Sequence, residues 1–264
     1  MITSSARPPA AEAATDPAPR PNEHPEVLGT DDLVKIYGGR AVVNGIKLEV
    51  GQGEIVGLLG KNGAGKTTSF YMIVGLVRPN SGRVVFSGTD VTDYPMYKRA
   101  RLGMGYLPQE ESIFRKMTVE QNILAILETM PLNKKERRHR CAELLHQFGI
   151  ERIAKNTALT LSGGEKRRLT IARSLVTQPK LLMLDEPFSG VDPIAVYDVQ
   201  QLVVNLRESG LAILITDHNV RETLSIVDRA YLIDEGRVVS EGTKDFLIND
   251  PISRQLYLGE RFQM

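Results

Sequence analysis

The stretch GKNGAGKT at residues 60–67 fits the pattern G-x-x-x-x-G-K-[ST] in full. Glycines at the fixed positions allow backbone N–H groups to curl around a phosphate group, and the lysine side chain can reach the β- and γ-phosphate oxygens. The threonine hydroxyl that follows is a ligand for Mg²⁺ in loops of this kind. We therefore predict a nucleotide site with Thr67 as a metal ligand. Its nucleotide-binding residues are Gly60, Asn62, Gly63, Ala64, Gly65, Lys66, Thr67 and Thr68.

Two adjacent carboxylates end the apolar stretch LLMLDE at residues 181–186. Open α/β sheets bind their ligands at the carboxyl ends of their strands, where this pair lies. We predict that Asp185 holds Mg²⁺ through water and that Glu186 polarises the water that attacks the γ-phosphate. Taken without the phosphate loop, two adjacent acids are as easily explained as solvated residues of a turn.

A second candidate phosphate-binding element is LSGGEKRRLTIARS at residues 161–174. A serine and two glycines lead there into a basic stretch with helical periodicity, and such a helix start can hold an anion. The alternative is a serine that only caps a helix. The chain thus has two phosphate-binding helix starts but one set of candidate catalytic carboxylates.

The elements that must position these residues can be predicted from apolar patterning. Continuous apolar runs at 54–60, 181–186 and 211–216 are typical of strands covered on both faces of a parallel sheet. Residues 195–209 have helical periodicity. Alternating residues and glycine placement at 231–242 predict a hairpin that turns at Asp234–Gly236.

The segment from about 93 to 160 differs from this pattern, because it holds two charged helical stretches, 118–130 and 132–150, and no obvious strand. We predict a helical subdomain inserted into the α/β core, with bounds at approximately 110 and 178. Residues 1–26 are rich in proline and alanine and predict a disordered tail, which leaves residues 27–264 as one domain.

Composition excludes several classes of protein. The formal net charge of +1 gives no chain-wide preference for nucleic acid, and we predict no nucleic-acid partner. A single cysteine excludes an internal disulfide and suits a reducing compartment. No apolar run approaches the roughly 18 residues that a membrane span needs, and the first residues lack the apolar region of a signal peptide. We therefore predict no direct membrane insertion.

The combination of GKNGAGKT, LSGG and LLMLDEP resembles the ATP-binding cassette (ABC) family from residue 28 onward. This resemblance implies an α/β fold with a P-loop NTPase core, an antiparallel β subdomain and an inserted α-helical subdomain. It implies ATP with Mg²⁺ as ligands and ATP hydrolysis as the activity. It also implies a head-to-tail homodimer, in which Ser162, Gly163 and Gly164 of one subunit close on the ATP held by the other.

Four further roles are implied by the same resemblance. Gln109 in GYLPQEES matches the glutamine that touches Mg²⁺ and the attacking water, and His218 in ITDHN matches the histidine that contacts the γ-phosphate. Asp192 in SGVDP matches an acid that communicates across the dimer. Tyr37 in KIYGG occupies the place of the aromatic that stacks on adenine. Outside the family context, Gln109 and His218 are ordinary polar loop residues and Tyr37 is an ordinary strand residue.

Longer stretches, among them PMYKRARLGMGYLPQEESIFRKMTVEQNI, resemble the ATPases of lipopolysaccharide export systems. That resemblance implies two integral-membrane permease subunits as partners and a peripheral location on the cytoplasmic face of the inner membrane. The implied permease-contact surface includes Phe114 and Arg115, supported by Met96, Tyr97 and Arg99, although Phe114 could instead belong to the core of the helical subdomain.

Departures from the export pattern include Lys61, where proline is usual, and EKRRLT after LSGG. The alternative functions are the ATPase of a branched-chain amino acid or related importer and a non-transport ABC ATPase. The non-transport class is disfavoured for two reasons. Its DNA-repair types insert long coiled coils between the phosphate loop and LSGG, whereas about a hundred residues separate these motifs here. Its translation-factor types carry two cassettes in one chain, whereas this chain has a single set of motifs.

Overall fold

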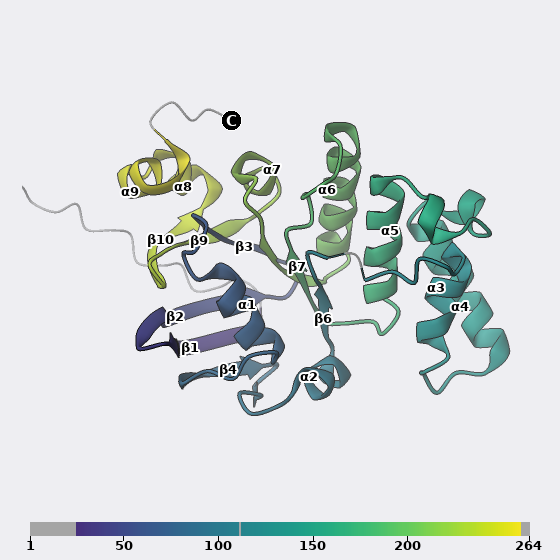
Figure 1. Cartoon of the computed structure of the whole chain (residues 1–264), viewed down its shortest axis with the longest axis horizontal. Helices are drawn as coiled ribbons and strands as arrows, with labels where there is room; N and C mark the ends of the chain where they lie inside the picture. The colour runs from purple at the N-terminus through teal and green to yellow at the C-terminus, as the bar shows by residue number, and fades with distance from the viewer. Residues whose placement is uncertain (1–24, 111, 260–264) are drawn as a thin grey trace, which may run out of the picture.

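A computed structural model describes residues 25–110 and 112–259, and its main feature is a six-stranded sheet (Figure 1). The strands lie in the order β10-β9-β3-β8-β7-β6, and all neighbours are parallel except the edge pair β9–β10. The strand bounds are β3 Ile55–Gly60, β6 Met104–Leu107, β7 Leu181–Asp185, β8 Ala212–Thr216, β9 Arg229–Asp234 and β10 Arg237–Thr243. The parallel order brings the ends of β3, β6, β7 and β8 to one edge of the sheet.

Both faces of this sheet are buried, which explains the continuous apolar runs. In β7, Leu182 and Leu184 pack into a core cluster shared with helices α3 to α6, whereas Leu181 and Met183 pack into a second cluster on the other face. Because successive side chains of a strand point to opposite faces, both sets must be apolar. The parallel strands predicted from the sequence are therefore confirmed.

The second face is covered by helix α1 (Lys66–Val74) and a smaller antiparallel sheet of order β2-β1-β4-β5. Helix α1 contacts strands of both sheets, and Figure 1 shows it between them. The strand bounds are β1 Glu26–Tyr37, β2 Arg40–Gly51, β4 Ser81–Phe86 and β5 Thr89–Asp90. The helix that follows the phosphate loop is thus packed between the two sheets.

Helices α3 to α8 contribute to the core cluster on the first face, whereas α2 packs against the cluster on the second face. The bounds of the remaining helices are α2 Met96–Leu102, α3 Val119–Leu127, α4 Lys134–Gln147, α5 Gly163–Ser174, α6 Pro193–Glu208, α7 Val220–Leu224, α8 Lys244–Asn249 and α9 Pro251–Ser253. Two short 3₁₀ helices, η1 Glu151–Ile153 and η2 Ala158–Thr160, and the π-helix η3 Arg254–Leu258 complete the set. Helices α3 and α4 pack against each other and lie farthest from the antiparallel sheet (Figure 1). The single cysteine, Cys141, is buried in their core, where burial raises the pKa of its thiol to about 11.

Two sequence expectations about local structure have a clear outcome. The hairpin is confirmed: Asp234 pairs with Arg237, and Glu235 and Gly236 have φ values of 44° and 78°, as a tight two-residue turn requires. The expectation of no strand between about 93 and 160 is wrong, because β6 lies there. With four residues at a sheet edge, paired only with β7, that strand is too short to show in an apolar pattern.

The N-terminal boundary differs by one residue from the predicted one. Strand β1 begins at Glu26, where it pairs with Gly51 of β2, whereas the tail was predicted to extend through residue 26. The rest of the predicted tail, residues 1–24, lies outside the described residues.

Candidate nucleotide-hydrolysis site

The lysine of the phosphate loop is hydrogen-bonded to the backbone of the same loop. Lys66 is the first residue of α1, and its Nζ donates to the carbonyl oxygens of Gly60 at 2.7 Å and Lys61 at 2.9 Å. Only 7% of Lys66 is exposed, and burial lowers the pKa of its ammonium group. Gly65 has a φ of 109°, and a Cβ there would lie 2.6 Å from the Val42 carbonyl oxygen, so the loop needs glycine at this position.

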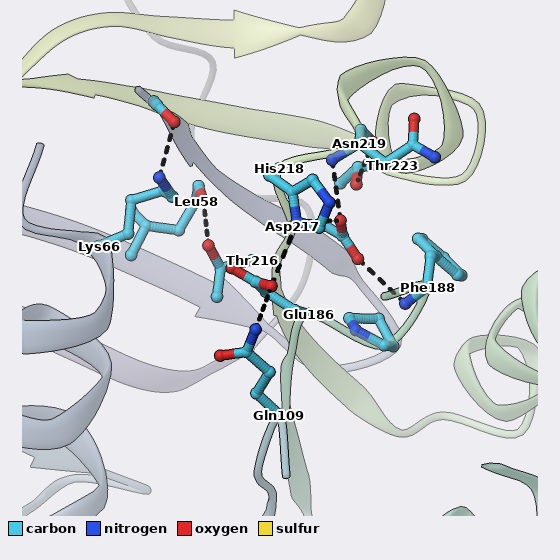
Figure 2. A network of polar contacts seen from close by, with 12 residues as sticks. Leu58, Lys66, Gln109, Glu186, Phe188, Thr216, Asp217, His218, Asn219 and Thr223 are labelled. Carbon is cyan, nitrogen blue, oxygen red and sulfur yellow. Dashed lines mark hydrogen bonds and ion pairs between the residues drawn. The ribbon is translucent and has the colours of Figure 1, made fainter. Parts of the chain in front are cut away.

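Glu186 lies at the centre of a polar cluster that joins three predicted residues (Figure 2). Gln109 Nε2 donates to Glu186 Oε2 at 2.6 Å, and His218 Nδ1 lies 3.2 Å from the same oxygen. The three residues follow β6, β7 and β8, so the parallel sheet brings them together. Since Gln109 and His218 both contact the carboxylate of the predicted base, a water held beside that carboxylate would meet all three side chains.

The backbone of Glu186 is held in a conformation that is rare for a residue with a side chain. Its φ is 47°, its N–H donates to the Thr216 carbonyl oxygen at 2.7 Å, and its own carbonyl accepts from Arg167 Nη2 at 2.7 Å. Arg167 also donates to the Pro187 carbonyl oxygen, and burial lowers its pKa to about 10. Sequence reasoning missed Arg167, because nothing in a basic helical stretch distinguishes the cation that folds inward.

Two buried carboxylates flank Glu186. Asp185 is 3% exposed and accepts from the Tyr106 hydroxyl at 3.3 Å, and Asp217 is fully buried and accepts from the backbone N–H groups of Phe188 and Asn219. Burial raises the pKa of both carboxyl groups. Asp217 and Tyr106 were missed by the sequence analysis, although both stand beside quoted motifs, in ITDHN and GYLPQ.

Ser162 caps helix α5. Its Oγ accepts from the Glu165 N–H at 3.3 Å, while Glu165 Oε2 accepts from the N–H and the hydroxyl of Ser162 at 2.8 and 2.9 Å. This reciprocal pair is a capping box, so the helix start predicted from the sequence is confirmed. Gly164 must be small, because a Cβ there would lie 2.9 Å from the Cβ of Ala195 on α6. Ser162 and Gly163 are exposed and open to a second molecule.

Asp192 and Tyr37 lie at the ends of other elements. Asp192 is exposed and caps α6, since its carboxylate accepts from the Ala195 N–H at 3.0 Å. Tyr37 ends β1 with 49% of its surface exposed, and Lys35 Nζ lies 5.2 Å from its ring centroid. An exposed aromatic ring at this position is compatible with stacking on a base.

Four of the five predicted permease-contact residues are at least partly exposed, and the fifth, Arg99, is buried. Phe114 is 47% exposed and Tyr97 57% exposed, Arg115 is also exposed, and Met96 is half-buried. Phe114 is therefore not a core residue, which was its alternative interpretation.

The prediction that Arg99 contacts a partner is wrong. Arg99 is 1% exposed, and it donates to the carbonyl oxygens of Met72, Ile73, Thr92 and Tyr94. Two of these carbonyls belong to the last turn of α1, where a helix leaves its C=O groups unpaired. Arg99 points inward because it supplies those donors, and burial lowers its pKa to about 10.

The residues present are suited to Mg²⁺ that is shared with a nucleotide. Within residues 25–110 and 112–259, no group of three or more His, Cys, Asp or Glu side chains could hold a metal by itself. Mg²⁺ commonly binds one or two protein oxygens and completes its shell with phosphate and water. The Thr67 hydroxyl at the start of α1 and the Asp185 carboxylate at the end of β7 supply such oxygens.

Comparison with known proteins decides the family. The model of the ABC transporter family matches residues 43–189, more than half of the chain. The lipopolysaccharide export system ATP-binding protein LptB of Acidithiobacillus ferridurans is 49% identical over 239 residues, which cover 90% of this chain and 99% of that protein. The chain belongs to the ABC transporter family. As an ABC cassette it is an ATPase, and the P-loop NTPase fold predicted from its motifs is confirmed.

Further relatives agree with this ABC assignment. A probable ABC transporter ATP-binding protein of Azorhizobium caulinodans is 55% identical over 237 residues, covering 90% of this chain and 84% of that protein. A crystal structure of an ATP-binding cassette in its ADP conformation superposes with a TM-score of 0.80 at 27% identity, covering 89% of this chain and 99% of the other. None of the helices in the described parts of the ABC cassette is long and apolar enough to cross a membrane.

Proposed function

We propose that this ABC cassette is the ATP-hydrolysing subunit of a lipopolysaccharide export transporter. The observation that carries the proposal is the likeness to LptB, which extends over 99% of that relative's length. LptB proteins of Haemophilus influenzae and Escherichia coli are 49% and 48% identical to this chain over similar lengths. A likeness that includes the stretches between the ATPase motifs supports a shared cargo, because those stretches differ among cassettes with different partners.

In the proposed reaction, Glu186 accepts the proton of the water that attacks the γ-phosphate, and ADP leaves as the bond between the β- and γ-phosphates breaks. Gln109 and His218, which both contact Glu186 Oε2, hold the water in line, and His218 also contacts the γ-phosphate. Lys66 exchanges its hydrogen bonds with the Gly60 and Lys61 carbonyls for the β- and γ-phosphate oxygens. Among the described residues no carboxylate forms an ion pair with this ammonium group, although Glu186, Asp185 and Asp217 act on it electrostatically, so its hydrogen bonds can pass to the nucleotide.

Thr67, Asp185 and Gln109 are the residues that would hold Mg²⁺, which neutralises phosphate charge when it is bound. A bound cation would favour the ionised form of Asp185, whose carboxylate is buried and whose pKa burial raises. The Tyr106 hydroxyl fixes one oxygen of that carboxylate and leaves the other for a water ligand of the metal.

The active unit that we propose is a homodimer with two ATP molecules at its interface. Ser162, Gly163 and Gly164 of one subunit face the nucleotide held by Lys66 of the other, and Asp192 lies on the same interface. The exposed capping box of α5 supports this arrangement, because its N-terminal N–H groups and helix dipole suit a phosphate. A two-fold axis completes both sites at once.

Two integral-membrane permeases are the proposed partners, and they place the dimer on the cytoplasmic face of the inner membrane. Their contact surface includes Phe114, Arg115, Met96 and Tyr97. Exposed aromatic residues beside a cation support it, since such residues often anchor protein interfaces.

Affinity purification from native membranes tests the proposal. The tagged full-length protein should bring down two integral-membrane subunits together with lipopolysaccharide, in amounts that ATP and Mg²⁺ change. Phe114→Ala should reduce capture about tenfold or more, as for a central interface anchor, whereas Phe246→Ala, an exposed aromatic on α8, should leave capture unchanged. Capture of importer permeases without lipopolysaccharide would reject the proposed cargo.

A further inference from the structure

The segment of residues 112–117, here called the docking loop, carries an exposed aromatic ring on a backbone that is hydrogen-bonded to helix α3. Asn122 of α3 is fully buried; its Oδ1 accepts from the Phe114 N–H at 2.8 Å, and its Nδ2 donates to the Phe114 carbonyl oxygen at 3.1 Å. The Phe114 side chain itself remains 47% exposed. A partner that binds this ring therefore meets a preorganised anchor whose main chain cannot yield independently of the helices behind it.

Arg173, in the last turn of α5, lies directly behind that ring. The centre of its guanidinium group is 4.6 Å from the Phe114 ring centroid, and its Nη1 donates to the Ser112 carbonyl oxygen at 2.5 Å. Arg173 is 9% exposed, and burial lowers its pKa. Among the described residues no carboxylate pairs with it, and its Nε is buried without a hydrogen-bond partner.

A buried cation with so few partners is costly, and a methionine would fill the same space with less desolvation. What the arginine adds is a directed contact between the docking loop and helix α5. Arginine can stack on an aromatic ring and donate to a carbonyl at the same time, because its planar group has separate faces and edges.

A second set of contacts joins the docking loop to the other end of α5. The Ala158 N–H donates to the Met117 carbonyl oxygen at 2.9 Å, and the Leu159 N–H donates to the Arg115 carbonyl oxygen at 3.0 Å. Residues 158 and 159 belong to η2 and precede Ser162 by four and three positions. Helix α5, about 18 Å long at 1.5 Å per residue, is thus tied to the docking loop near its first residue and near its last.

We infer that Arg173 is a positioning residue that couples partner docking on Phe114 to the placement of Ser162. A partner that displaces the Phe114 ring moves the docking loop, and Arg173 passes this movement to α5. The N-terminus of that helix is thereby set toward or away from the ATP of the second subunit. This inference rests on the proposed function, which supplies both the partner and the dimer.

The test compares Arg173→Met with Arg173→Lys and with Arg152→Met, an exposed arginine of the same subdomain that serves as the matched control. Three quantities are measured for each variant: ATP affinity of the isolated subunit, permease capture, and kcat and KM of the complex. For Arg173→Met we expect ATP affinity and capture within about twofold of the parent and a kcat about tenfold lower at unchanged KM, a loss within the range of measured coupling energies. Arg173→Lys should recover part of the kcat, because it restores a donor to the Ser112 carbonyl without the planar stacking group.

The outcomes separate the inference from the proposal beneath it. Parental kcat in a folded Arg173→Met complex overturns the inference, and so does an equal loss of ATP affinity in the isolated subunit. If Arg173→Met does not fold, Arg173→Lys decides: a kcat equal to that of Arg152→Met overturns the inference. Failure of the parent protein to capture any permease instead rejects the proposed function.

Discussion

Glu186 combines a reactive carboxylate with a left-handed backbone that side chains seldom adopt. Such a conformation costs about 1–3 kcal/mol, and here the Thr216 carbonyl and Arg167 fix it from both sides. The carboxylate is thereby turned toward Gln109 and His218. A backbone conformation that costs stability in order to orient one carboxylate is typical of a functional residue.

Glu186→Gln should abolish hydrolysis while keeping nucleotide binding. The amide has nearly the same shape but cannot accept the proton of the attacking water, so we expect kcat to fall by about 10²–10⁴-fold and ATP-bound dimers to accumulate. Steady-state phosphate release and size-exclusion chromatography with ATP measure both effects. Glu128→Gln, on the exposed end of α3, is the control. Normal turnover in Glu186→Gln would remove this residue from its proposed role.

Asp185→Asn should stabilise the nucleotide-free protein at neutral pH. Because burial raises the pKa of Asp185, the folded state binds more protons than the unfolded chain, and ionisation of this group costs stability. The cost is about 1.4 kcal/mol for each pH unit of the upward shift. It is present at pH 7 and disappears as the pH falls through the raised pKa toward the ordinary value of about 3.9.

Chemical unfolding of Asp185→Asn and the parent between pH 4 and 8 measures this difference, with the exposed Asp32→Asn as control. The stability advantage of Asp185→Asn should be largest at neutral pH and vanish near pH 4. An advantage that does not change with pH would show that ionisation of Asp185 is not its source.

At the scale of elements, Arg99 joins α2 to the end of α1, whose first residue is Lys66. Arg99→Met leaves four carbonyl oxygens without this donor, and those of Met72 and Ile73 are buried, so the free energy of unfolding should fall by about 3 kcal/mol or more. Arg101→Met, on the exposed side of the same helix, should change it by less than about 0.5 kcal/mol. Urea unfolding gives both values, and equal stabilities would contradict the structural role of Arg99.

Sequence patterns predicted the elements whose signal is local. The phosphate loop, the strand ending at Asp185 and the helix cap at Ser162 each follow from residues that are adjacent in the chain. Arg99 was placed on the wrong side of its helix, because a stretch with several cations does not reveal which of them meets carbonyls from another element. Asp217 was missed for a similar reason, since its partner Phe188 lies 29 residues away. Contacts between distant segments can be identified only when the fold is known.

At the scale of the whole molecule, the proposed homodimer places the exposed start of α5 of one copy and the phosphate loop of the other in one shared site. Turnover per subunit should therefore rise with protein concentration until dimers predominate, because association follows mass action. Ser162→Arg should bind ATP normally yet lose hydrolysis at all concentrations, since the arginine blocks closure. Thr177→Arg, an exposed position beyond the other end of α5, should behave as the parent. A dilution-independent rate would show that one copy suffices.

The burial of Cys141 between α3 and α4 has a practical consequence for following that closure. With 2% of the side chain exposed and a thiol pKa of about 11, this cysteine forms very little thiolate near neutral pH and is shielded from reagents. Fluorophores can therefore be attached selectively to Lys47→Cys and Lys116→Cys in an otherwise native chain, at exposed positions on the antiparallel sheet and the docking loop. Energy transfer between the two dyes would then report any change in the distance between the docking loop and the antiparallel sheet in real time, with no need to remove the natural thiol.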